Sequence, residues 1–146
     1  MLFPFFPLKS TFSLFLSRSL AAFAENFCRH KRRHRFVMRR FHGISGAAVR
    51  HGAHAVFHPH FHLAARGSYR PTTFADPANT FHEKAALCRA AENTCYFATV
   101  NFASDGAPTT SAIVRPDGTL LSYQPYGEEG LLIADIDIDA ATGLLA

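Results

Sequence analysis

Short segments of regularly spaced apolar residues begin at about residue 50. The apolar run Ala53–Phe57 is entered through Gly52 and closed by His58-Pro59. Because a strand that is covered on both faces is apolar at successive positions, this run predicts a buried strand. Proline removes a hydrogen-bond donor from a sheet, so the strand is expected to end there. A long loop, His58–Thr73, is expected to follow.

A helix that ends near Asn93 is predicted after this loop. Asp76-Pro77 supplies an N-cap acceptor and then a proline at the first helical position, where the missing N–H costs nothing. Thr80–Glu83 offers a second capping box slightly further along the chain. The residues expected to face a core recur at helical spacing, and they are Phe81, Ala85, Cys88, and Ala91 or Glu92.

The rest of the pattern predicts strands joined by tight turns. Arg115–Gly118 is typical of a hairpin turn, because its proline presets the backbone and its glycine accepts a positive φ. The element order predicts an α/β or α+β layered fold with a largely buried sheet. The strands are expected at Cys95–Asn101, Ser111–Val114, Leu120–Tyr123 and Leu131–Asp139.

Charge divides the chain of 146 residues into two unlike parts. Residues 1–70 hold twelve Lys or Arg and one acid, for a net charge of +11, whereas residues 71–146 hold three basic residues and ten acids, for −7. Such a split favours two separate regions, a basic leader over 1–49 without a recognisable domain and a folded domain over 50–146. The hydrophobic content of 48% excludes wholesale disorder, and no apolar run reaches the length of a membrane span.

The leader is expected to be weakly structured and to contain no strand. Residues 1–24 are apolar and rich in serine, so an N-terminal targeting segment is an alternative interpretation. Residues 29–40 form a basic run that is able to neutralise phosphates, yet no zinc-knuckle or helix-turn-helix pattern surrounds it. A solvated, self-repelling segment is therefore favoured over specific nucleic-acid binding.

Several motifs of the second half stand at characteristic separations. Arg89-Ala-Ala-Glu92-Asn93 ends the predicted helix, Pro116-Asp-Gly118 forms the predicted hairpin, and Glu128-Glu-Gly-Leu-Leu-Ile-Ala-Asp-Ile-Asp137 forms the last strand. Together with the segment Arg50–Phe61, they resemble the C-terminal portion of the carbon–nitrogen hydrolase (nitrilase) superfamily. The resemblance covers about residues 50–146.

This resemblance implies a partial α-β-β-α sandwich preceded by a disordered or poorly packed basic leader. It also implies hydrolysis of C–N bonds in small amides, nitriles or carbamoyl compounds, by a cysteine nucleophile, a glutamate base and a lysine that stabilises the oxyanion. No cofactor is implied. A cytoplasmic location, association into homo-oligomers and no membrane span are further expectations of the resemblance.

The catalytic motifs of the superfamily are not found in this chain. Counting back from His58, the nucleophile is expected near position 35, where the sequence has Arg35. Cys28 matches neither the distance nor the surrounding motif, and Lys9 and Glu25 have no motif around them. We therefore assign no catalytic residue and predict a chain without hydrolase activity.

The remaining candidate residues receive structural or neighbourhood roles. The resemblance implies that His58, His60 and Phe61 lie beside a substrate pocket. A structural role is expected for Arg89, Glu92 and Asn93, which are able to hold the helix end by charged hydrogen bonds. Alternation of His58, His60 and His62 also suits zinc or nickel, but we assign no metal ligand. The other two cysteines, Cys88 and Cys95, are expected to be small buried hydrophobes. The three aspartates of the last strand are expected on its exposed face rather than around calcium, and they are Asp135, Asp137 and Asp139.

The sequence therefore predicts a partial, inactive carbon–nitrogen hydrolase domain behind an unrelated leader. A changed reading frame, a wrong gene start or a decayed gene would each explain the abrupt change of charge near residue 50. Two other function classes stay open, a non-catalytic interaction or oligomerisation module and a nucleic-acid-binding protein that uses residues 29–40.

Overall fold

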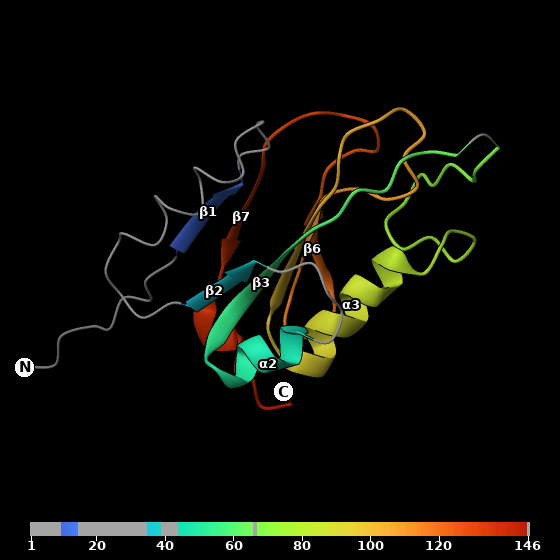
Figure 1. The fold of residues 1–146 in the computed structure, drawn as a ribbon. Coiled ribbons are helices and arrows are strands. Elements are labelled where there is room, and N and C mark those ends of the chain that lie inside the picture. The colour runs from blue at the N-terminus through green and yellow to red at the C-terminus, as the bar shows by residue number, and fades with distance from the viewer. Residues whose placement is uncertain (1–9, 15–34, 39–43, 66, 146) are drawn as a thin grey trace, which may run out of the picture.

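The computed structural model describes residues 10–14, 35–38, 44–65 and 67–145 (Figure 1). Its helices and strands follow the order predicted from the sequence, with two strands and one short helix added before residue 51. The elements are β1 (Ser10–Leu14), β2 (Arg35–Met38), α2 (Ile44–Arg50), β3 (Ala53–Pro59), α3 (His82–Asn93), β4 (Tyr96–Val100), β5 (Ala112–Val114), β6 (Leu120–Tyr123), β7 (Leu132–Ile136) and the 3-10 turn η1 (Ile138–Ala140).

The strands form two sheets within the described residues. The larger has five strands in the order β2-β3-β4-β5-β6, of which β2, β3 and β4 are parallel and the last two pairs are antiparallel. The smaller pairs β1 with β7 antiparallel, so that the last strand leaves the main sheet. The expectation of no strand in the leader is wrong at β1 and β2. The leader also contributes helix α2, whose Val49 is buried in a core. Residues 1–9 and 15–34, with most of the targeting and basic segments, lie outside the described residues.

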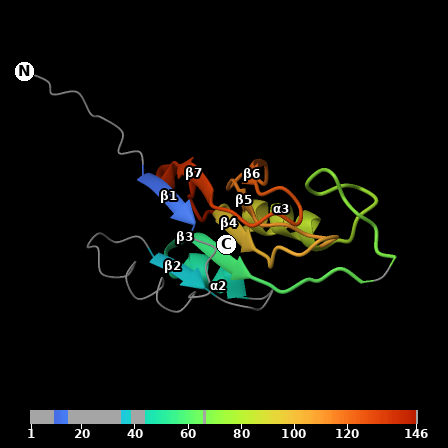
Figure 2. The same ribbon diagram turned by 90° about the horizontal axis from the view of Figure 1, so that it is seen from above.

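The layers are α-β-β, with the two helices on one face of the main sheet and β1–β7 on the other (Figures 1 and 2). All five residues of β4 are buried, because this strand is covered on both sides. Its alternate side chains enter two separate cores. The core toward β7 contains Tyr96, Ala98, Val100, Ile113, Leu132 and Ile136. The core toward the helices contains Val49, Val56, Ala86, Ala90, Cys95, Phe97 and Val114.

The predicted hairpin turn is confirmed at Arg115–Gly118. The Gly118 N–H donates to the Arg115 carbonyl at 2.9 Å, and the Arg115 N–H donates to the Thr119 carbonyl at 2.8 Å. Gly118 adopts φ of 82°, which side chains other than glycine disfavour. The Asp117 carboxylate accepts from the Thr119 N–H at 2.9 Å, so the turn carries its own side-chain support.

The predicted start of α3 at Asp76-Pro77 is wrong, since the helix begins at His82. Asp76 instead closes a separate turn, in which its carboxylate accepts from the Ala78 N–H at 2.9 Å and its carbonyl accepts from the Asn79 N–H at 3.0 Å. The Lys84 ammonium donates to the carbonyl of Asn79 at 2.8 Å, which holds this turn against the helix. The end of the helix at Asn93 is confirmed.

The predicted buried face of α3 is also wrong. Phe81 is 62% exposed and Cys88 is exposed, which overturns the expectation that this thiol is buried. The buried stripe contains two polar residues whose hydrogen bonds are made inside the protein, so the apolar pattern of the sequence did not mark it. The buried residues are Glu83, Ala86, Ala90 and Asn93.

The last strand ends at Ile136, earlier than the predicted Asp139. The Asp137 carboxylate accepts from the Asp139 N–H at 3.0 Å and starts a 3-10 turn in place of further strand. The predicted alternation is confirmed along β7 and η1, with buried Leu132 and Ile136 and exposed aspartates between and beyond them.

The hairpin glycine gives a test of the packing between β5–β6 and α3. A Cβ on Gly118 would lie 2.9 Å from the Ala91 Cβ and 3.2 Å from the Leu87 carbonyl oxygen, whereas a Cβ on Gly52, also at positive φ, meets nothing within 4 Å. We expect Gly118→Ala to lower the free energy of unfolding by about 2 kcal/mol or more, and Gly52→Ala by about 1 kcal/mol. Urea unfolding followed by circular dichroism measures both, and equal losses would contradict the predicted clash.

Candidate functional site

A cavity of about 390 Å³ lies between α3 and the carboxyl ends of β3 and β4. Its wall contains all three residues that the sequence placed beside a pocket: His58, His60 and Phe61. It also contains His82 and Arg89 from α3. The full lining is His58, Pro59, His60, Phe61, His62, His82, Ala85, Ala86, Arg89, Phe97, Thr99 and Thr109. We call this space the histidine cavity.

Helical spacing explains the α3 wall of the histidine cavity. His82, Ala85, Ala86 and Arg89 stand at i, i+3, i+4 and i+7, which places them on one face of the helix. The two alanines are small, so they leave space between the larger side chains at either end of this stripe. The opposite wall is the end of β3, where the His60 N–H donates to the Val100 carbonyl at 2.9 Å and prolongs the strand contact.

Thr109 organises two of the histidines. Its hydroxyl oxygen lies 3.1 Å from His60 Nε2 and 3.5 Å from His62 Nδ1, and it accepts from Asn101 Nδ2 at 3.0 Å. One proton arrangement serves all these contacts: the hydroxyl donates to His60, and it accepts from His62 and Asn101. Because Thr109 is 2% exposed, its hydroxyl is largely removed from bulk solvent.

Asn101 fixes the segment that carries these histidines. Its side-chain oxygen accepts from the His62 N–H at 2.9 Å, and its Nδ2 donates to the His62 carbonyl at 3.0 Å. The Asn101 side-chain amide thus pairs with both backbone groups of His62, as a neighbouring strand would do. The loop after β3 is thereby held to the residue that follows β4.

The four imidazoles lie in two neighbouring pairs. The rings of His62 and His82 have centroids 4.4 Å apart and a tilt of 54°, and those of His58 and His60 stack at 5.6 Å. His82 Nδ1 also lies 3.0 Å from the Thr80 hydroxyl. In the part of the chain that the structure describes, no group of three or more His, Cys, Asp or Glu residues is arranged to hold a metal ion.

Burial lowers the pKa of His60 from 6.5 to about 4. Removing the ring from water disfavours its charged form, and the positive charge of the neighbouring His58, His62 and His82 acts in the same direction. The hydrogen bond with the His58 carbonyl opposes these effects and is smaller than the first. His60 is therefore neutral near pH 7, and it contributes a polar but uncharged surface to the cavity wall.

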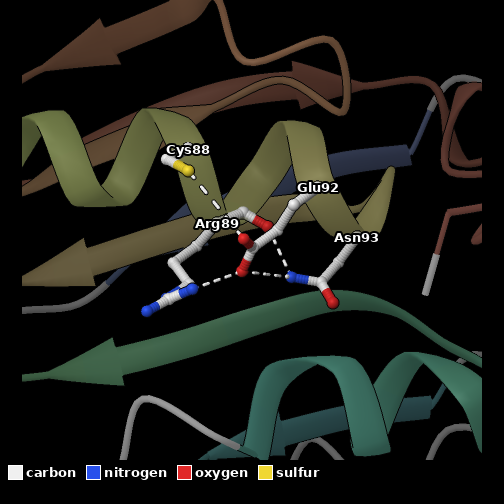
Figure 3. Close-up of polar contacts among 4 residues, drawn as sticks. All are labelled: Cys88, Arg89, Glu92 and Asn93. Atoms are coloured by element: carbon white, nitrogen blue, oxygen red, sulfur yellow. Dashed lines mark hydrogen bonds and ion pairs between the residues drawn. The ribbon is translucent and has the colours of Figure 1, made fainter.

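The polar cluster at the end of α3 joins the three residues expected there (Figure 3). Arg89 Nη1 donates to Glu92 Oε1 in an ion pair, and Asn93 Nδ2 donates to the Arg89 carbonyl at 2.8 Å. Cys88 Sγ lies 3.8 Å from Glu92 Oε2. Arg89 also lines the histidine cavity, which the sequence did not predict, and its Nε is buried without an acceptor among the described residues.

Neither described cysteine lines the histidine cavity. Cys95 is buried as expected, and burial, followed by the charge of Glu92, raises the pKa of its thiol to about 12. Cys88 is on the exposed side of α3. The other residues weighed for catalysis, Cys28, Lys9 and Glu25, lie outside the described residues.

A buried carboxylate supports the helix beside the cavity, and sequence reasoning missed it. Glu83 is 3% exposed and accepts from the Ala75 N–H at 2.8 Å, the Thr110 N–H at 3.1 Å and the Tyr126 hydroxyl at 2.8 Å. Burial and the hydrogen bond to Glu83 raise the pKa of Tyr126 above its usual range. The Thr80–Glu83 capping box was the available signal, but the carboxylate binds distant segments instead of the helix start.

Thr109 and His82 are two further wall residues that the sequence did not indicate. Thr109 belongs to no motif, and its place in the wall depends on contacts with residues 47 and 49 positions away. His82 is the isolated ninth histidine, and only the start of α3 brings it to His62.

Among the described residues, no helix has the length and apolar character needed to cross a membrane.

No protein-family model and no curated protein sequence matches this chain. Solved structures do match it. It is similar to Saccharomyces cerevisiae Nit3, a member of branch 10 of the nitrilase superfamily, with 21% sequence identity and a TM-score of 0.53 over 73% of this chain and 38% of that one. Two others are a mutant of the amidase from Nesterenkonia sp. AN1 in complex with butyramide (22% identity, TM-score 0.48, 73% and 38% covered) and a carbon-nitrogen hydrolase from Helicobacter pylori G27 (16%, 0.47, 74% and 42%).

The match to Nit3 confirms the resemblance at the level of fold. The chain has the fold of part of a nitrilase-superfamily structure, and the observed α-β-β layers are three of the four layers expected. It spans 38% of the length of Nit3.

His60 gives a pH prediction. Its pKa of about 4 in the folded chain lies below the ordinary value of 6.5, so the unfolded chain binds the proton more tightly. The stability that the neutral ring supplies is therefore complete above pH 6.5 and is lost as the pH falls toward 4. We expect the C2 proton of His60 to keep one NMR chemical shift between about pH 5.5 and 8, while the urea-unfolded chain titrates normally. Titration of the folded ring near 6.5 would contradict its burial.

Proposed function

We propose that this chain is a non-catalytic relative of the carbon–nitrogen hydrolases, whose histidine cavity binds a small molecule without hydrolysing it. The observation that carries the proposal is the composition of the cavity wall. It contains four imidazoles, two threonines and one guanidinium, but no thiol among its described residues. Hydrolysis in the superfamily that the fold resembles needs a cysteine thiolate within reach of its substrate.

The cysteine, lysine and glutamate that the structure describes on or next to α3 and β4 do not supply a substitute for this chemistry. Cys95 is buried in the core with a raised pKa, so its thiol stays protonated near pH 7. The Lys84 ammonium donates to the carbonyls of Pro77 and Asn79, which commits it to the turn before α3. The Glu83 carboxylate is saturated by hydrogen bonds from three segments and is not part of the cavity wall.

The class of ligand is also part of the proposal, because the chain spans only 38% of the length of Nit3. Small amides and nitriles are the compounds on which the resembled superfamily acts, and an amidase of similar fold has been solved with butyramide. A cytoplasmic location belongs to the same proposal. Nucleic-acid binding through residues 29–40 stays a sequence prediction, since most of that run lies outside the described residues.

The activity prediction is direct. We expect no release of ammonia from acetamide, propionamide or butyramide by the purified chain, because a thiolate, a base and an oxyanion cation act as a unit and their loss costs several orders of magnitude. A coupled ammonia assay measures this, with a thiol alkylator added in parallel. Turnover that survives Cys28→Ala and disappears with Cys88→Ala would overturn the proposal and identify a different nucleophile.

One observation favours a second candidate function, self-association through the β1–β7 sheet. Ile133 is 51% exposed and Leu131 is 41% exposed, and Ile133 lies on the outer face of β7. Apolar side chains exposed on a short two-stranded sheet favour contact with another surface. A second copy of this chain presents the same face and so fits a two-fold contact.

This candidate predicts a defined change of oligomeric state. We expect Ile133→Ser to shift the protein toward a monomer, because it removes an exposed apolar side chain from the proposed contact. Light scattering after size-exclusion chromatography measures the mass over a range of concentrations. Leu144→Ser is the matched control, since Leu144 is 81% exposed but lies beyond β7. An equal shift by both variants, or by neither, would contradict association through β7.

A further inference from the structure

We propose that the ligand of the histidine cavity is a small aliphatic carboxylate, with Arg89 as its anchor. The inference rests on the proposed function in one respect, which is that the cavity binds a small molecule and does not convert it. Three properties of the wall support the carboxylate class: its charge, an unused hydrogen-bond donor, and the distribution of its apolar surface.

The charge of the wall is one-sided. Its described residues include the Arg89 guanidinium and four imidazoles, whereas no aspartate or glutamate lines the cavity. The Glu92 carboxylate is paired with Arg89 Nη1 and is not part of the lining. A cavity whose ionisable groups are all cationic or neutral favours an anion over a cation.

Arg89 carries the unused donor. Its Nη1 is taken by Glu92, and Figure 3 shows the side chain extended from α3 with this edge of the guanidinium turned toward the carboxylate. The Nε atom is buried without an acceptor among the described residues. A buried donor without a partner is costly, and a ligand or ion is one of the partners that complete such a hydrogen bond. A carboxylate matches this requirement, because it accepts charge-assisted hydrogen bonds from a guanidinium.

The apolar part of the wall limits what the rest of the ligand can be. Ala85 and Ala86 lie between Arg89 and His82 along the helix, and Phe97 lies across from them on β4. The distance from Arg89 to His82 along the helix axis is about 10 Å, at 1.5 Å per residue. An alkyl chain of a few carbons fills such a space against alanine and phenylalanine, while a second charged group there would lose its water.

The test compares a carboxylate with the neutral amide of the same shape. In a ¹⁵N–¹H NMR spectrum, we expect butyrate to move the Nε–Hε resonance of Arg89, and butyramide to bind about ten-fold more weakly or worse, because it lacks the charge that strengthens the hydrogen bond. Ala85→Leu fills the cavity while keeping Arg89, and it should abolish the shift. His51→Gln is the matched control, since His51 lies on the exposed turn after α2, and it should leave the affinity unchanged.

Each outcome decides between the carboxylate proposal and a rival. Equal binding of butyrate and butyramide would overturn the anionic class, and a larger effect of inorganic phosphate than of butyrate would overturn the carboxylate class. A shift that persists in a folded Ala85→Leu variant would place the anion elsewhere. Ammonia release from butyramide would overturn the proposed function, whereas absence of both ammonia and a butyrate shift would overturn this inference alone.

Discussion

Burial of β4 on both faces is the constraint on which the rest of this structure depends. A central strand that is buried at every position has to be covered twice, by helices on one side and by a second layer of strands on the other. Tyr96 and Ala98 therefore require β7, which lies in a different sheet, and Phe97 requires α3. The two cores are small, and each joins segments that are distant in the sequence.

The same double covering positions the histidine cavity. Because β3 lies beside β4 in parallel, the chain leaves the sheet at the carboxyl end of β4, and His60 and His62 line the cavity together with residues of α3. Where the helix offers Ala85 and Ala86, the two walls separate. The cavity is thus a consequence of small residues on the stripe of α3 that faces the end of β3, combined with a loop that Asn101 and Thr109 hold in place.

Local signals predicted much of this architecture, and non-local contacts account for the rest. Strand β6, the turn at Gly118 and the end of α3 all follow from patterns a few residues long, and the structure has each of them. The pocket neighbours His58, His60 and Phe61 came from a resemblance and do lie together in one wall.

The errors share one physical cause. The start of α3 and its buried face were misplaced because two buried polar residues satisfy their hydrogen bonds inside the protein, which an apolar pattern does not reveal. Glu83 does so through the distant Thr110 N–H, and Asn93 through the Arg89 carbonyl one helical turn earlier. Strands β1 and β2 were missed because pairing with β7 and β3 outweighs weak local preferences. Thr109 and Arg89 entered the cavity wall only through tertiary contacts.

The buried Glu83 carboxylate has a consequence for how the domain assembles. It links segments 27 and 43 residues apart, through Thr110 and Tyr126, and it also holds Ala75 in the loop before the helix. Such contacts have a high sequence separation, so loop-closure entropy is spent before they form. We therefore expect the first turn of α3 to gain its support late, after the strands of the β5–β6 hairpin have met. We also expect opening of the loop around Tyr126 to be coupled to fraying of that first turn, so that amide protons in both segments exchange together.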